Sequence, residues 1–168
     1  MKLPFSMPFT RSTLVDVTPT GGFFTAWTEN FLIKKYDQNG KYIRAFYYPV
    51  KKSKLSLNAL HINKIRRKVL RNYKMPKTWP ALDAMELDSK GRLWVATITG
   101  SKTSFRWWVL SRQGKPVARF TFPGKRKARR VMPKPIVEIK KGYFYTHRYD
   151  IRKGIDQIVK YKINFEAN

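Results

Sequence analysis

Short apolar runs separated by turn residues dominate the chain, and the clearest set lies between Trp79 and Pro123. Apolar residues cluster at positions 81–87, 93–98, 107–110 and 117–122. The three gaps carry turn residues at 89–91, 100–102 and 112–114, each including a glycine. Because such punctuated runs are typical of short strands joined by tight turns, we predict a four-stranded antiparallel unit here.

The same pattern recurs before and after this unit. We predict strands at residues 14–18, 23–28, 31–36 and 42–48, and then at 136–139, 143–149 and 158–163. The pair Asn39-Gly40 lies between two of these runs and is a strong hairpin signal. Units of about 40 to 45 residues with four strands each are typical of β-propeller blades. We therefore predict an all-β partial β-propeller with two complete four-stranded blades, a three-stranded third blade and one inserted helix.

The connections between the units have a different composition. Between residues 51 and 78, Ile62, Ile65, Val69 and Tyr73 recur at three- and four-residue steps, which predicts a helix at 57–73 with Ser56 as its N-cap. We predict a single domain over residues 1–168. It comprises a blade at 14–50, a basic helical linker at 51–78, a blade at 79–123, a basic loop at 124–134 and an incomplete blade at 135–165.

The second unit also carries a family resemblance. The segments DSKGRLWV at 88–95, WWVLSRQG at 107–114 and FTFP at 120–123 resemble blades of the bacterial six-bladed β-propellers related to NHL-repeat and lactonase-like proteins. Six blades need roughly 240 residues, so the resemblance implies the C-terminal half of such a ring. In that family an N-terminal strand often completes the last blade. The resemblance therefore implies either a fragment or assembly with a second copy, and full-length relatives are often exported.

Charge is the most unusual property of the sequence. It has 36 Lys and Arg against 10 Asp and Glu, a net charge of +26. Residues 51–74 contribute nine of the cations and residues 124–141 contribute eight, so 17 of the 36 lie in the two connections. In a propeller such links share one face, which predicts a strongly positive face that attracts polyanions. The candidate contact residues are Lys64, Arg66, Arg67, Lys68, Arg71, Lys125, Arg126, Lys127, Arg129 and Arg130.

Other candidate chemistry is sparse. There is no cysteine, and His61 and His147 lie in no catalytic motif, so we predict no catalytic residue, cofactor or metal site. Lactonase-like propellers hold a divalent metal with acidic residues, and Asp16 and Asp83 occupy inner strands. We expect Asp83 to be solvated and Asp88 to cap the turn at 89–91.

Two aromatic side chains raise a separate expectation. Trp107 and Trp108 are adjacent on one predicted strand and must point to opposite faces. We expect only one of them to be buried between blades, with the other exposed beside basic residues. The remaining tryptophans are expected to pack between blade sheets.

Three functions stay open at this point. The first is a binding or scaffold module whose basic face binds an acidic polysaccharide, an anionic lipid surface or nucleic acid without sequence preference. The second is a fragment of a lactonase-like hydrolase, and the third is a truncated product without independent function. Exposed blade edges would favour self-association. Pro4 and Pro8 interrupt any apolar run at the N-terminus, and no stretch approaches roughly 18 apolar residues, so we predict neither a signal peptide nor a transmembrane segment.

Overall fold

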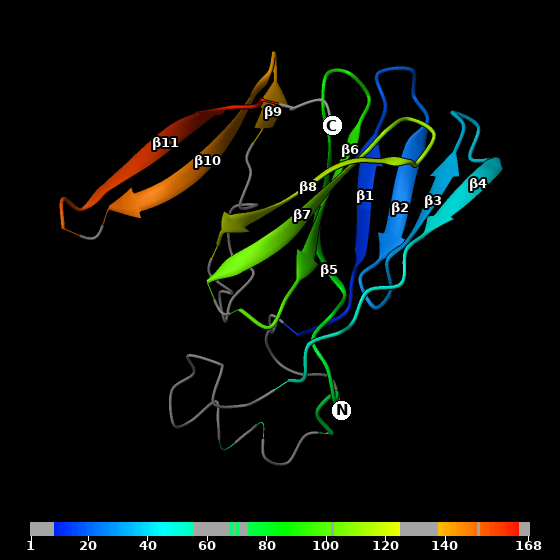
Figure 1. Ribbon diagram of the computed structural model, residues 1–168. Coiled ribbons are helices and arrows are strands. Elements are labelled where there is room, and N and C mark those ends of the chain that lie inside the picture. The colour runs from blue at the N-terminus through cyan, green and yellow to red at the C-terminus, as the bar shows by residue number, and fades with distance from the viewer. Residues whose placement is uncertain are drawn as a thin grey trace.

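The computed structural model describes residues 9–55, 68, 70, 74–101, 103–124, 138–150 and 152–164. Within these residues eleven strands form three antiparallel sheets (Figure 1). The first sheet contains β1 (Thr13–Val17), β2 (Phe23–Trp27), β3 (Leu32–Tyr36) and β4 (Tyr42–Tyr47). The second contains β5 (Leu82–Leu87), β6 (Leu93–Ile98), β7 (Ser104–Leu110) and β8 (Pro116–Pro123). The third contains β9 (Glu138–Lys140), β10 (Tyr143–Asp150) and β11 (Ile155–Lys162).

The strand order confirms the prediction of two four-stranded units and one three-stranded unit. Within each sheet, strands that follow one another in sequence are neighbours in space. The inserted helix expected at 57–73 falls almost entirely outside the described residues, which include only Lys68 and Leu70 of that span. No helix is among the elements that the described residues form.

The first strands of successive sheets lie against one another, with β1 beside β5 and β5 beside β9. The later strands of each sheet extend away from this common line (Figure 1). Three antiparallel sheets with adjacent first strands fit a propeller-like arrangement. The turns β1–β2, β3–β4, β5–β6 and β7–β8 lie at one end of the sheets, at the top in Figure 1, and we call this the turn end. We call the opposite end, where the first sheet connects to the second, the link end.

The four turns at the turn end share one design. Thr18, Asp37, Asp88 and Ser111 each begin a turn with a glycine three residues later, and the backbone N–H of that glycine donates to the first residue's carbonyl. Each of these glycines has a φ between 70° and 86°, a region that side-chain-bearing residues rarely adopt. In the hairpin at Asp37, only Gly40 of the Asn-Gly pair has a positive φ. The side chains of Asp37, Asp88 and Ser111 also accept backbone N–H groups two and four residues later.

Hydrophobic packing joins the three sheets through both faces of the second one. All six residues of β6 are buried, and its five apolar residues divide between two clusters. Leu93 and Val95 pack with Phe24 and Ile33 of the first sheet. Trp94, Ala96 and Ile98 pack in the cluster that contains Ile139 and Phe144 of the third sheet. The second sheet is therefore the centre of a three-layer stack.

This stacking corrects the expectation for the tryptophan pair. Trp107 and Trp108 do point to opposite faces, but both are buried, at 1% and 8% exposure. Trp107 lies in the cluster shared with the third sheet, and Trp108 lies in the cluster shared with the first. The expectation of one exposed ring was wrong because a central sheet has a neighbouring sheet on each side.

Candidate functional site

A short backbone ladder at the link end holds the connection between the first and second sheets. Trp79 N–H donates to the Ser53 carbonyl at 2.9 Å, and Leu55 N–H donates to the Lys77 carbonyl at 3.0 Å. Lys54 and Thr78 form the antiparallel bridge between these two bonds. We call residues 51–55 and 74–79 the stem. The chain leaves the sheets and returns to them side by side at the stem, so residues that are far apart in sequence are neighbours here.

The stem concentrates positive charge. Lys51, Lys54, Lys74 and Lys77 are all exposed, and none takes part in an ion pair with another described residue. The sequence contains no acidic residue between positions 51 and 82. Because the ladder brings the two stem segments together, their like charges create a locally positive surface that attracts anions.

The acid that contributes an ion pair to the stem is Glu29, in the β2–β3 turn. Its carboxylate contacts the Arg11 guanidinium and the Lys52 ammonium. The hydrogen bond from Arg11 is the main reason that the pKa of Glu29 is lowered; partial burial opposes this effect and Lys52 adds to it. Arg11 also donates to the carbonyls of Phe9 at 2.9 Å and Thr78 at 3.0 Å. Glu29 therefore fastens the stem to the first sheet while its charge is already shared by two cations.

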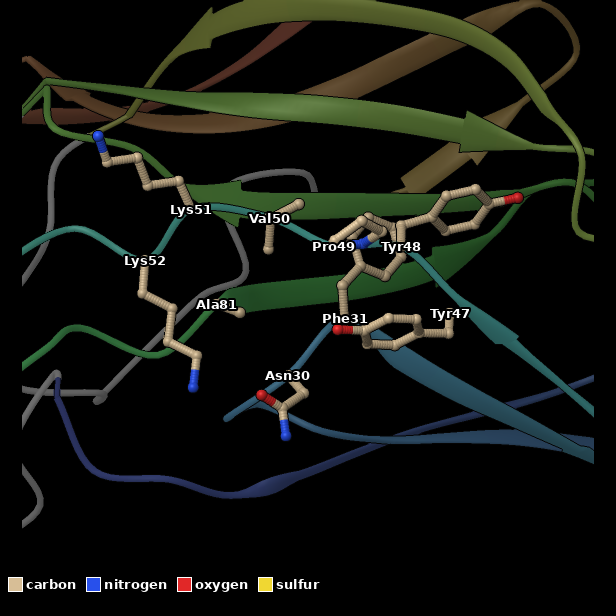
Figure 2. Close-up of a pocket in the computed structure, with 9 residues that line it drawn as sticks. All are labelled: Asn30, Phe31, Tyr47, Tyr48, Pro49, Val50, Lys51, Lys52 and Ala81. Atoms are coloured by element: carbon tan, nitrogen blue, oxygen red, sulfur yellow. The ribbon is translucent and has the colours of Figure 1, made fainter.

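A pocket of about 300 Å³ lies beside the stem (Figure 2). Its apolar lining includes the buried residues Phe31 and Ala81, and the partly buried Val50. Lys51 and Lys52 line it on the stem side, and Figure 2 shows their side chains diverging from the backbone in opposite directions. The pocket at the link end is thus lined by both apolar and polar residues, two of them stem lysines.

The second-to-third strand turn of the third sheet carries a further group of cations. Arg152 and Lys153 are exposed in this turn, and Arg148 is exposed near the end of β10. The acid among them is Asp150, whose Oδ1 accepts the backbone N–H groups of Arg152 at 3.0 Å and Lys153 at 3.2 Å. The carboxylate thereby organises its own turn.

Of the predicted polyanion contacts, the structure describes Lys68, which is exposed. Outside the described residues lie Lys64, Arg66, Arg67, Arg71, Lys125, Arg126, Lys127, Arg129 and Arg130, as does His61. The expectation that both basic connections share one face stays a prediction. The sequence analysis placed Lys51, Lys54, Lys74 and Lys77 in the basic linker at 51–78 but did not select them as candidate contacts. The acid-free stretch up to residue 82 was the signal that could have found them.

The acidic candidates have structural roles where their contacts are described. Asp88 caps its turn as predicted, accepting the N–H groups of Lys90 and Arg92 at 2.9 Å each. Asp16 accepts the N–H of Leu87 at 2.5 Å and so joins β1 to β5. Asp83 is partly buried rather than fully solvated. Among the described residues no group of three or more histidines and acids is placed to hold a metal ion.

The remaining candidates are placed on the outer sheets or in the core. His147 Nε2 lies 2.6 Å from Asp156 Oδ1 on the third sheet. Trp79 and Trp94 are buried, as expected for packing between sheets, whereas Trp27 is 52% exposed on the first sheet.

The described part of the chain contains no helix of the length and hydropathy needed to cross a membrane. A search against protein-family models and a search of curated proteins both find no match to this chain.

Proposed function

We propose that this chain is a propeller-type binding module that binds polyanions at its link end. The observation that carries the proposal is the stem, where four exposed lysines lie on two segments that backbone hydrogen bonds hold together. The nearby Glu29 carboxylate is engaged by Arg11 and Lys52. The candidate residues at 64–71 lie in the sequence between the two stem segments, so the stem tethers these further cations at both ends.

Binding of this kind works through the charge of the polyanion backbone. Lysines that neutralise phosphate, sulfate or carboxylate groups release the counterions condensed on them, and this release drives association. The interaction is indifferent to sequence because contacts to the backbone carry no base information. Affinity falls steeply with salt, and the slope reports how many charges are neutralised.

The experiment must distinguish binding at the stem from a general effect of the net charge of the chain. A stem variant carries Lys51→Gln, Lys54→Gln and Lys77→Gln, and a control variant carries Lys41→Gln, Lys90→Gln and Lys115→Gln at the turn end. Both remove three charges from exposed positions. Binding to a short DNA duplex of mixed sequence is measured as a function of salt.

We expect the stem variant to lower the slope of log affinity against log salt by about 3 units, since each phosphate contact contributes about 0.9. The control variant should change the slope by less than about 1 unit. Equal effects of the two variants would show that only net charge matters, and absence of binding by the unmodified chain at about 50 mM salt would reject the proposal.

The family assignment is a second part of this proposal. We infer that this chain corresponds to the C-terminal half of a six-bladed propeller of the lactonase-like or NHL-related kind. Support comes from the adjacent first strands β1, β5 and β9 and from the glycine turn that recurs at Thr18 and Asp88.

A further inference from the structure

The first sheet has an open face on the side away from the second sheet, which we call its outer face. The strand register places Val17, Phe23, Tyr36 and Tyr42 in one row across the four strands of this face. A second row contains Val15, Thr25, Lys34 and Ala45. The rings of Phe23 and Tyr36 stack with centroids 4.9 Å apart, and Tyr42 packs edge-on to Tyr36 at 6.0 Å. These two rows carry one charge, that of Lys34.

Much of this face is apolar surface in contact with water. Trp27, Tyr42 and Tyr47 are 52%, 54% and 64% exposed, and Val15 and Val17 are 55% and 60% exposed. With about 150–250 Å² for a whole aromatic side chain, the three rings alone offer on the order of 300 Å². The valines and the partly buried neighbours extend this area toward the roughly 800 Å² per partner of a standard protein interface. Exposed apolar patches of several hundred Å² are typical of interaction sites on protein surfaces.

The corresponding face of the second sheet shows what kind of surface covers it. There the register places Leu87, Leu93 and Leu110 in one row, in the positions that Val17, Phe23 and Tyr36 occupy in the first sheet. Leu93 and Leu110 are 1% and 0% exposed because the first sheet packs on them. The row of Met85, Val95 and Trp108 is likewise buried. This side of the four-stranded unit is thus buried in the second sheet, where the first sheet covers it, and exposed in the first sheet.

The third sheet leaves the opposite side of the repeated unit exposed, and we call this side its outer face. Phe144 and Ile139 face the second sheet, so the alternate positions Tyr143, Tyr145, His147 and Tyr149 of β10 face away from it. Their partners on β11 include Ile158 and Lys160. Tyr149 and Ile158 are 57% and 63% exposed. In the first and second sheets this side packs against the next sheet of the chain.

We propose that the outer face of the first sheet binds the outer face of the third sheet of a second copy of this chain. The association repeats, between copies, the sheet-on-sheet step that occurs twice within one copy. It is a head-to-tail contact, which closes into a ring when the rotation allows and otherwise continues as an open chain. Within one copy, the Lys160 ammonium lies 3.9 Å from the ring centroid of Tyr143. The outer face of the third sheet therefore already holds a lysine against an aromatic ring.

Electrostatics gives this association a distinctive salt dependence. Each copy carries a net charge of +26, so two copies repel one another at low salt. Raising the salt concentration shortens the screening length from about 10 Å at 0.1 M to about 3 Å at 1 M and leaves apolar burial intact. Self-association therefore strengthens with salt, whereas polyanion binding weakens, and failure of one proposal is distinguishable from failure of the other.

The test is the mass of the full chain in solution, measured by sedimentation at 0.1 M and 1 M salt. Val17→Lys blocks the first-sheet face, Ile158→Lys blocks the third-sheet face, and Val117→Lys on β8, which is 49% exposed in the wild type, is the control with the same added charge. Circular dichroism and thermal unfolding establish that each variant is folded. A face variant that does not fold is replaced by Tyr42→Lys or Tyr149→Lys, which alter the same two faces at exposed positions.

We expect the wild type and Val117→Lys to form species larger than one copy at 1 M salt, and Val17→Lys and Ile158→Lys each to remain single copies. A mixture of the two face variants should form a 1:1 pair, since each retains the face that the other lacks. A wild type that remains a single copy under both conditions overturns the proposal. So does loss of assembly in Val17→Lys but not in Ile158→Lys, which would indicate that two first sheets pack on each other.

Discussion

Replacing Asp88 with alanine removes a buried carboxylate that organises the β5–β6 turn. Its Oδ1 accepts the N–H groups of Lys90 and Arg92, each at 2.9 Å. Its Oδ2 accepts Arg92 Nε at 2.6 Å and the indole Nε1 of Trp94 at 3.0 Å. Asp88 is 5% exposed and Trp94 is 1% exposed. Water therefore cannot readily replace the carboxylate as the acceptor for the indole.

The expected loss of stability is set by this burial. A buried donor left without its acceptor costs about 1–3 kcal/mol, and the lost bonds to the turn backbone add about 1 kcal/mol. We expect Asp88→Ala to lower the free energy of unfolding by about 3 kcal/mol. Asp37→Ala removes the same pair of backbone bonds, at 2.9 and 2.8 Å, from an exposed turn. Because water can solvate those N–H groups, we expect a loss of about 1 kcal/mol there.

Urea unfolding followed by tryptophan fluorescence measures both values. Asp37→Ala is the matched control because each substitution raises the net charge by one unit, so self-repulsion changes similarly in the two variants. The melting temperature should fall by about 6–12 °C for Asp88→Ala and by about 2–4 °C for Asp37→Ala. Equal losses in the two variants would refute the reasoning, since they would show that burial of the Asp88 network contributes nothing beyond the turn bonds.

Two further predictions concern pH and backbone conformation. The lowered pKa of Glu29 means that its contribution to stability is complete above its usual value of 4.5 and is lost as the pH falls through the lower folded value. The wild-type melting temperature should therefore drop below about pH 4.5 by an increment that Glu29→Gln lacks, and parallel pH profiles for the two proteins would contradict this. Gly114 has a φ of 86°, and a Cβ there would lie 2.1 Å from Phe46 Cδ1, so Gly114→Ala should cost about 3 kcal/mol in urea unfolding. Gly40→Ala, at a φ of 78° with nothing within 4 Å, should cost about 1 kcal/mol, and equal costs would show that the contact with Phe46 is unimportant.

The sequence predicted the sheets well where local patterns determine them. The limits predicted for β6 at 93–98 are those observed, because glycine turns bound a continuous apolar run on a sheet buried on both sides. For β7 the prediction began at Trp107, three residues late. Ser104 and Arg106 interrupt the apolar run there, but they alternate with the buried Phe105, and this alternation is itself a strand signal.

Local sequence patterns could not predict the properties that depend on neighbouring sheets. Burial of both Trp107 and Trp108 requires a layer on each side of the second sheet, and no window of sequence around the pair reports that. The stem is similar, because Lys54 and Thr78 become partners only through an antiparallel bridge across 24 positions. The bond from Leu87 N–H to Asp16 Oδ2 spans 71 positions and assigns a structural role to an acid that resemblance alone would associate with a metal.

Five of the ten acidic residues have contacts that belong to the fold itself. Asp16, Asp37, Asp88 and Asp150 accept backbone N–H groups, and Glu29 joins two cations to hold the stem. These carboxylates are committed to turns and sheet junctions, so they cannot reorient toward exposed lysines without loss of structure. Those five carboxylates therefore do not neutralise the exposed stem lysines, and under the proposed function the neutralising anions come from solvent or from a bound polyanion. The polyanion proposed to bind there would supply many such charges in one molecule, and release of the small ions condensed on it would drive the association.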